Sequence, residues 1–298
     1  MIFLDEAAVR RLLRMVDLIP AMEGALADLS SRKAVQPVRQ VVAVADHQGF
    51  LGVMPAYNQA LGAKLVTFYP NNRGIPTHHA IIQLFRPETG EPLIMMDGRL
   101  ITEMRTAAVS AAVTNYLAAP ESRVLALLGS GVQARAHLDA LAQIRRFEEV
   151  RVWSRTAAHA ERFAEQHGAR ATTREAAIRG ADVIVTATNA LEPVLEGAWL
   201  KPGAHVNAVG SPRPGWRELD DRAMANTLVV DSREAVLKES GDVILSKATI
   251  YAEAGEIFAG TKETPAGTTT VFKSVGMAIE DIATAKLVYD AASRQVIG

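Results

Sequence analysis

The feature that most constrains this chain is a glycine-containing turn between an apolar strand-like segment and a helix. Residues 123–128 are followed by Gly129, Gly131 and Ala134 in the spacing G-x-G-x-x-A. The first glycine permits a tight turn, the second lets the backbone approach a pyrophosphate, and the alanine allows close packing of helix on strand. Free N–H groups at the start of the helix attract phosphate. The alternative interpretation is a glycine-rich turn that binds no ligand. The segment predicts dinucleotide binding by Gly129, Ser130, Gly131, Val132, Gln133 and Ala134.

Beyond residue 120, short apolar strands alternate with amphipathic helices. The strand-like segments VLALLG, VRVW, ADVIVTAT, GAHVNAVG and NTLVVD are continuously apolar. This pattern is typical of a parallel sheet that is covered on both faces. The predicted fold class is α/β, with a Rossmann-type doubly wound parallel sheet over 120–271 and a smaller α+β domain formed by 1–119 with 272–298.

The smaller domain mixes helix-like and strand-like segments. Helices are expected at 4–13, 16–29 and 102–119, strands at 38–45, 63–68 and 79–85, and a loop at 69–76. A last helix, 274–292, is expected to return to this domain because both ends of the chain otherwise lack a packing partner.

Composition excludes several classes of site. The chain has no cysteine, which removes disulfides, thiol nucleophiles and thiolate metal ligands, and fits a reducing cytoplasm. Its net charge of −1 gives no general field for nucleic acid or anionic membrane. We find no signal peptide, no membrane span and no metal-ligand spacing, so we expect a soluble cytoplasmic protein without a metal.

The residues after the second strand of the parallel sheet bear on cofactor choice. An enzyme that uses NAD usually places Asp or Glu here to hold the ribose hydroxyls, but this chain has Ser154, Arg155 and Thr156. Guanidinium and hydroxyl donors favour a 2′-phosphate, so the sequence favours NADPH over NADH. The alternative is that Arg155 is a solvated loop residue.

Three cations of the first domain occupy positions where a solvated charge is not expected. Arg39 shares a strand face with the apolar residues at 41 and 43, and Lys64 shares a strand face with those at 66 and 68. Arg105 lies near the positive end of a helix dipole, where a cation is unfavourable unless an anion binds there. Each cation also has a purely structural interpretation: Lys64 could be a charge that protects an edge strand from pairing, and the two arginines could form structural ion pairs. Together they predict a pocket for a small carboxylate, in which Lys64 could lend a proton. His78 and His79 could flank it, although surface positions are the simpler interpretation.

Several segments carry a family resemblance along nearly the whole chain. GAKLVTFYPNN with GIPTHH, MDGRLITEMRTAAVSA, GSGVQARAH, NAVGSPRPGWRELDD and TTVFKSVGMAIED resemble the ornithine cyclodeaminase/mu-crystallin family. The resemblance implies a homodimer whose first domain forms the interface and the substrate side, with the Rossmann domain inserted in it. It also implies that Arg39, Lys64 and Arg105 bind a substrate carboxylate. The loops 186–189 and 209–211 would approach the nicotinamide, which adds these candidates: Thr186, Ala187, Thr188, Val209 and Gly210.

One departure separates branches of that family. Members that release ammonia are expected to carry an aspartate two residues after the glycine of the AVG segment, and this chain has Pro212 there. Proline cannot exchange a proton, so the sequence is more similar to the imine reductases. We therefore expect NADPH-dependent reduction of a cyclic ketimine carboxylate, Δ1-pyrroline-2-carboxylate or Δ1-piperideine-2-carboxylate, to proline or pipecolate. The alternatives are an ornithine cyclodeaminase, another amino-acid, opine or imine dehydrogenase, and a non-catalytic NADPH-binding protein similar to mu-crystallin.

Overall fold

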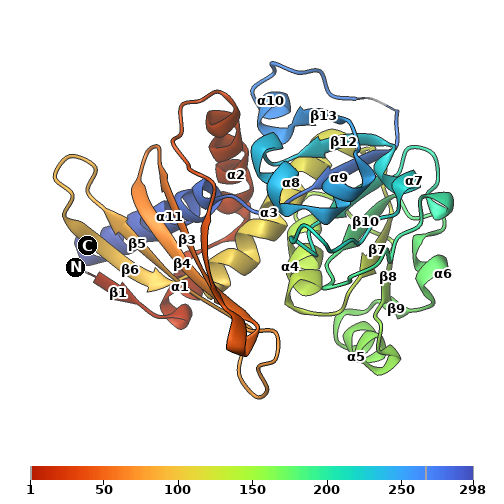
Figure 1. The fold of residues 1–298 in the computed structure, drawn as a ribbon, viewed down its shortest axis with the longest axis horizontal. Helices are drawn as coiled ribbons and strands as arrows, with labels where there is room; N and C mark the ends of the chain where they lie inside the picture. Colours follow the sequence, from red (N-terminus) through yellow and green to blue (C-terminus); the bar gives the residue numbers. More distant parts are fainter. Residues whose placement is uncertain (1, 266, 298) are drawn as a thin grey trace. The chain divides into compact units, whose positions relative to one another are not determined.

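The computed structural model describes residues 2–265 and 267–297, and the chain divides into two compact units. The first unit comprises Met1–Arg105 and Gly276–Gly298, and the second comprises Thr106–Val275. Figure 1 shows both units with most of their helices and strands labelled. The division expected from the sequence, a substrate-binding and dimerisation domain of 1–119 with 272–298 and a cofactor-binding domain of 120–271, stays a prediction.

The first unit is built on a six-stranded sheet of order β1-β6-β5-β4-β3-β2. Only β1 and β6 run parallel, and the other neighbours are antiparallel. The strands are β1 (Ile2–Leu4), β2 (Gln40–Val44), β3 (Gly49–Tyr57), β4 (Leu61–Phe68), β5 (His78–Phe85) and β6 (Pro92–Asp97). The helices are α1 (Glu6–Leu12), α2 (Met15–Ser30), α11 (Ala278–Ile297) and the short 3-10 helix η1 (Ala45–His47).

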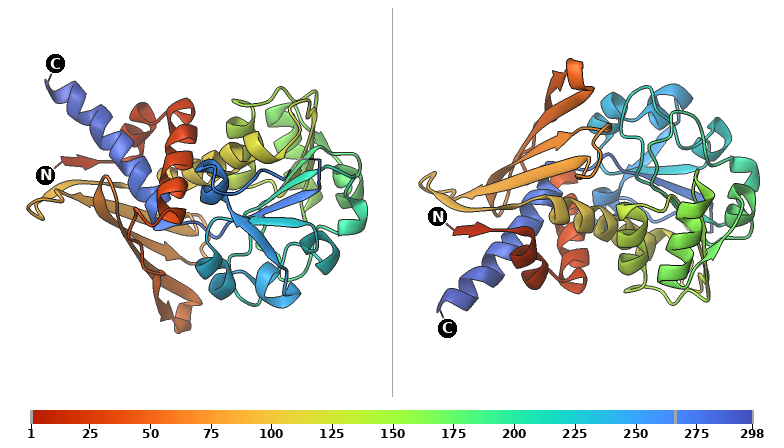
Figure 2. Two further views of the ribbon diagram at one scale, coloured as in Figure 1. Left: turned by 90° about the horizontal axis from the view of Figure 1, so that it is seen from above. Right: turned by 90° about the horizontal axis from the view of Figure 1, so that it is seen from below.

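Helix α11 covers one face of this sheet. It contacts β3, β4, β5 and α2, and Figure 2 shows it running across the strands. Met54, Lys64 and Ile82 are paired across β3, β4 and β5, so they share the covered face, and all three are buried. Alternation puts the next pair, Leu65 and Ile81, on the opposite face, where both are exposed. Lys64 is thus a charged residue on the apolar face of the sheet.

The second unit has an eight-stranded sheet of order β13-β12-β14-β11-β10-β7-β8-β9, and every pairing is parallel. The strands are β7 (Val124–Leu128), β8 (Glu149–Trp153), β9 (Arg170–Ala171), β10 (Val183–Thr186), β11 (His205–Ala208), β12 (Thr227–Val230), β13 (Ile250–Glu253) and β14 (Thr270–Lys273). Its helices are α4 (Val132–Leu141), α5 (Ala157–His167), α6 (Arg174–Ile178), η2 (Gly197–Trp199), α7 (Asp221–Met224), α8 (Arg233–Glu239), α9 (Gly241–Ser246) and α10 (Ala254–Phe258). The α/β class and the Rossmann-type parallel sheet expected from the sequence are confirmed.

The long helix α3 (Arg99–Leu117) begins in the first unit and ends in the second. From residue 107 onward it carries small buried residues, including Ala107, Ala108 and Ala111, so the backbone of other elements can approach closely. No helix among residues 2–265 and 267–297 has the length and apolar character that crossing a bilayer requires.

Some predicted elements were wrong in their bounds. The first helix was expected from residue 4, but Leu4 ends the edge strand β1, where pairing with β6 overrides helix propensity, and α1 begins at Glu6. The last helix begins at Ala278 rather than at residue 274. Residues 274–277 form a connection in which Gly276 has φ +82°, and the Val275 N–H donates to Asp231 instead of to a helical carbonyl. The strands β3, β6, β9, β13 and β14 were not expected.

Candidate functional site

The loops at the carboxyl ends of β7, β8, β10 and β11 meet where the strand order reverses. Chain order runs outward from β7 through β8 to β9 on one side and through β10 and β11 on the other. In open parallel sheets, ligands bind outside the carboxyl ends of the strands at such a point. The glycine turn follows β7, and the Ser154 and Arg155 segment follows β8.

Gly129 and Gly131 shape this turn in different ways. Gly129 has φ +121°, and a Cβ there would lie 2.6 Å from the Ala187 carbonyl oxygen, so only glycine fits. A Cβ on Gly131 would meet nothing within 4 Å, so this glycine faces open space. Gly131 is the N-cap of α4 and makes no side-chain cap, which leaves helix N–H groups for an anion. The glycine turn and the free N–H groups at the start of α4 therefore fit the pyrophosphate of a dinucleotide.

A cavity of about 560 Å³ lies against this turn. Predicted residues on its wall are Gly129, Ser130, Gly131, Ser154, Arg155, Ala187 and Thr188, and further lining residues are Trp153, His159, Arg162, Phe163, Gln166, Asn189, Ala190 and Val194. Its lining contains two arginines and a histidine but no carboxylate. The cavity therefore suits an anionic ligand with an apolar ring. The sequence did not single out His159 and Arg162, which lie three residues apart on α5.

The remaining cofactor candidates do not line that cavity. Val132, Gln133 and Ala134 form the first turn of α4, where buried Ala134 permits close packing. Thr156 is the N-cap of α5 and makes no side-chain cap. Thr186, Val209 and Gly210 lie at the ends of β10 and β11, where the N–H groups of Val209 and Gly210 donate to the Thr186 carbonyl at 3.0 and 3.3 Å.

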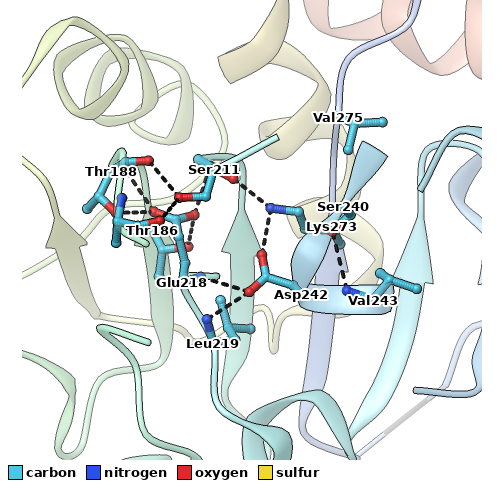
Figure 3. Close-up of polar contacts among 12 residues, drawn as sticks. Thr186, Thr188, Ser211, Glu218, Leu219, Ser240, Asp242, Val243, Lys273 and Val275 are labelled. Carbon is cyan, nitrogen blue, oxygen red and sulfur yellow. Dashed lines mark hydrogen bonds and ion pairs between the residues drawn. The ribbon is translucent and has the colours of Figure 1, made fainter. Parts of the chain in front are cut away.

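Glu218 connects the loops that follow β10 and β11 (Figure 3). Its carboxylate accepts four hydrogen bonds, from Thr186 Oγ1 at 2.8 Å, Thr188 N at 2.6 Å, Thr188 Oγ1 at 2.7 Å and Gly210 N at 2.8 Å. Burial raises the pKa of Glu218, and the positive charge of Lys273 opposes that rise. Because four donors converge on its two oxygens, we assign the ionised form.

Asp242 and Lys273 extend this arrangement. Asp242 accepts hydrogen bonds from the N–H groups of Glu218 and Leu219 at 2.8 and 2.9 Å. Lys273 Nζ lies 2.9 Å from Asp242 Oδ2 and donates to the Gly210 carbonyl at 2.7 Å. The side chains of Glu218, Asp242 and Lys273 are all 0% exposed. We call these three residues the buried charge network.

The three predicted cations lie together in the first unit, and we call Arg39, Lys64 and Arg105 the cationic cluster. Lys64 forms an ion pair with Asp281 of α11. Arg105 Nε lies 3.0 Å from Asp281, and its Nη1 lies 2.6 Å from Glu280. Arg39 donates to the Gly276 carbonyl at 2.7 Å. A Cβ on Gly276 would lie 2.6 Å from Arg105 Nη1, so the arginine rests against this backbone.

The cationic cluster sets the titration of the groups around it. Burial lowers the pKa of Lys64 to about 8. The negative charge of Asp281 opposes this decrease, and the positive charges of Arg105 and Arg39 add to it. Burial and the charges of Lys64 and Arg105 lower the pKa of His78 to about 4, so this histidine is neutral at pH 7. Although burial acts to raise it, Arg105 and Lys64 hold the pKa of Asp281 below its usual value. The site combines a lysine that can exchange a proton near neutral pH with two fixed guanidinium groups.

Sequence reasoning missed the acidic partners of this cluster. Asp281 and Glu280 lie in the segment MAIED, where two adjacent carboxylates beside an apolar run could have indicated a buried counter-charge. His78 begins strand β5, and its pKa is lowered by burial and then by the charges of Lys64 and Arg105. Among the described residues, no three His, Asp or Glu side chains gather as a candidate metal site.

A parallel sheet with a glycine turn at its point of reversal, together with a separate cationic cluster, defines a class of oxidoreductases that bind a dinucleotide on a Rossmann-type sheet. The sequence model of the ornithine cyclodeaminase/mu-crystallin family matches residues 1–295. The chain belongs to this family, as its sequence segments indicated.

Three proteins similar to this chain in sequence or structure are reductases or dehydrogenases. The chain is 54% identical over 285 residues to the ketimine reductase mu-crystallin of Rattus norvegicus, covering 92% of this chain and 91% of the relative. It is similar to the structure of Thermococcus litoralis Δ1-pyrroline-2-carboxylate reductase in complex with NADH and L-proline, with 38% identity, a TM-score of 0.94 and coverage of 99% and 98%. An archaeal alanine dehydrogenase dimer with bound NAD gives 33% identity, a TM-score of 0.93 and coverage of 100% and 98%.

Proposed function

We propose that the protein reduces a small cyclic ketimine carboxylate, Δ1-pyrroline-2-carboxylate or Δ1-piperideine-2-carboxylate, to L-proline or L-pipecolate with NADPH. The observation that carries this proposal is the cationic cluster, in which the buried Lys64, with its lowered pKa, stands beside the buried Arg105 and the half-buried Arg39. Relatives at 54% and 38% identity are named for ketimine and pyrroline-2-carboxylate reduction, which supports the same reaction class.

Arg39 and Arg105 would hold the substrate carboxylate. A buried guanidinium binds a carboxylate strongly when its orientation is already fixed. The carboxylates of Glu280 and Asp281 fix Arg105, and the Gly276 carbonyl fixes Arg39. A substrate carboxylate bound by the two arginines would orient the C=N carbon for reaction.

Lys64, or a water that it positions, would supply the proton that the imine nitrogen takes up. A proton donor works best when its pKa is near the working pH, and the pKa of Lys64 is about 8. Asp281 orients the ammonium group through their ion pair. The nicotinamide, when bound, supplies the hydride that reduces the imine carbon, so C=N becomes CH–NH and NADPH becomes NADP⁺.

Arg155 supports NADPH as the preferred cofactor. It lines the cavity beside Ser154, His159 and Arg162, and that lining has no carboxylate to repel a 2′-phosphate. The Thermococcus litoralis relative is described with NADH. A comparison of binding and turnover with NADPH and with NADH tests this preference.

The decisive comparison for the reaction class is between a reductase and a lyase. With NADPH and Δ1-pyrroline-2-carboxylate, we expect loss of nicotinamide absorbance and formation of proline. With ornithine and NAD, we expect no ammonia, because Pro212 cannot exchange a proton. Ammonia from ornithine without turnover of cyclic imines would overturn the proposal and support a cyclodeaminase.

We also propose a homodimer formed through the first unit. The sheet face opposite Lys64 exposes Val42, Leu65 and Ile81, at 58%, 38% and 42% of their surface. Neighbouring exposed apolar residues on one face are a property of association surfaces. Sedimentation of the unaltered protein and of Leu65→Glu tests this assignment, and a monomer in the unaltered protein would contradict it. The cytoplasmic location stays a prediction that cell fractionation can test.

A further inference from the structure

The buried charge network is not used by the proposed chemistry, yet it lies beside the loops assigned to the nicotinamide. Lys273 is the last residue of β14, Asp242 lies in α9, and Glu218 accepts hydrogen bonds from residues that follow β10 and β11 (Figure 3). Burying three charged side chains is costly, and well-packed apolar residues would often give equal or greater stability. A requirement for a defined loop geometry would explain why charged residues stand here.

Glu218 fixes the two loops to each other. Two of its hydrogen bonds come from Thr188 after β10, and one comes from the Gly210 N–H after β11. A Cβ on Gly210 would lie 2.3 Å from the Thr188 carbonyl oxygen and 2.4 Å from Glu218 Oε1, so the loops are in direct contact. Replacing one carboxylate oxygen by an NH₂ group would remove acceptors that the backbone N–H groups need.

Lys273 fixes the other side of the same loop. Its ammonium group donates to the Gly210 carbonyl and is paired with Asp242, which also holds the Glu218 N–H. Ser211, which follows Gly210 in the chain, has φ +49°, which is uncommon for a residue with a side chain. Both polar groups of the Gly210 backbone are thus held by the network, and the strained Ser211 follows directly.

We infer that Lys273, Asp242 and Glu218 are positioning residues that hold the loops 186–189 and 209–211 in the geometry needed for hydride transfer. This inference rests on the proposed function, because it assumes that these loops contact the nicotinamide. The network acts on the distance between the reacting carbons rather than on the affinity for the adenosine half of the cofactor. A misplacement of about 1 Å can cost a rate on the order of 100-fold.

Single-turnover kinetics of the full-length protein with NADPH and Δ1-pyrroline-2-carboxylate test the inference. In Lys273→Met, we expect hydride transfer to slow about 10- to 100-fold. The dissociation constant of NADPH should stay near that of the unaltered protein, and the deuterium isotope effect with deuterated NADPH should rise because hydride transfer becomes rate-limiting. Asp242→Asn keeps an acceptor for the two backbone N–H groups but removes the charge opposite Lys273, and it should show a smaller decrease.

A matched control is available in the same sheet. Lys201 forms an ion pair with Asp182, which immediately precedes β10 at the opposite end of that strand. Lys201→Met should leave hydride transfer and the isotope effect unchanged. Unchanged hydride transfer in folded Lys273→Met and Asp242→Asn would overturn the inference, as would a loss confined to NADPH affinity. If Lys273→Met does not fold, Asp242→Asn decides.

The fluorescence lifetime of bound NADPH gives a reading that needs no turnover. Lys273→Met should shorten it, because the nicotinamide gains freedom of motion when the Gly210 loop is released. An unchanged lifetime would contradict the inference. Failure of the proposed function has a different signature, because the unaltered protein would then bind NADPH without oxidising it with any cyclic imine.

Discussion

Lys64 of β4 and Asp281 of α11 form an ion pair in which both side chains are buried. The same carboxylate also receives the guanidinium of Arg105, so one aspartate orients two of the three cations in the cluster. Because α11 carries this carboxylate onto the covered face of the sheet, the last helix of the chain is part of the candidate site.

Replacing Lys64 by methionine should decrease the rate of imine reduction strongly. Loss of a positioned proton donor costs about 10²- to 10⁴-fold. The affinity for NADPH should be preserved, because the glycine turn and the cofactor cavity belong to the second unit. Steady-state kinetics with a fluorescence titration of NADPH measure both quantities, and an unchanged rate would remove Lys64 from the mechanism.

The pH dependence of the reaction should report the titration of Lys64. If the protonated lysine is the donor, the rate falls as the pH rises through its pKa of about 8. Burial lowers that pKa, and the charge of Asp281 raises it. In Asp281→Asn the opposing charge is lost, so the decrease should begin at a lower pH. If the pH–rate profiles of the unaltered protein and Asp281→Asn superimpose, a group other than Lys64 controls the pH dependence.

Arg155 should set the preference between cofactors. A hydrogen bond to a charged group contributes about 1.5–3 kcal/mol, so Arg155→Ser should weaken NADPH binding by about 10- to 150-fold. Binding of NADH should change little because it has no 2′-phosphate. Arg170→Ser is a suitable control, since Arg170 lies on β9 in an ion pair with Glu149 and outside the cavity. Equal losses for both cofactors would contradict the assignment.

The two glycines of the turn should respond differently to alanine. Gly129→Ala introduces a Cβ at φ +121° against the Ala187 carbonyl, and it should destabilise the fold by about 1–3 kcal/mol. Gly131→Ala meets open space in a backbone conformation that any residue adopts, so thermal stability should be kept. NADPH binding should nevertheless be lost, because the added Cβ would occupy the space predicted for the pyrophosphate. Normal NADPH binding by Gly131→Ala would place the cofactor elsewhere.

Local patterns in the sequence were sufficient for the class of the parallel sheet and for the turn after β7, although β9, β13 and β14 were not expected. The required turn residue, Gly129, and its flanking strand and helix lie within one short segment, so their spacing alone predicts the arrangement. The cationic cluster could be anticipated for a similar reason. A charge on an apolar strand face, as for Lys64, needs a partner wherever that face is buried.

The partners themselves could not be predicted, because they depend on long-range packing. Asp281 reaches Lys64 only because α11 returns to a sheet formed near the other end of the chain. Glu218, Asp242 and Lys273 come from three separate segments that the strand order brings together. Lys273 carried a usable signal, since a lysine that ends the apolar strand TVFK needs a buried acceptor.

The central claim is that the cationic cluster recognises the carboxylate of a cyclic imine that NADPH then reduces. The most direct test compares NADPH oxidation with Δ1-pyrroline-2-carboxylate and with Δ1-pyrroline, the same ring without the carboxylate. We predict rapid oxidation with the first compound, and kcat/KM lower by about 100-fold or more with the second, since the hydrogen bonds that Arg39 and Arg105 would make to the substrate carboxylate are then lost. Equal kcat/KM for the two rings, or no oxidation with either, would contradict the account.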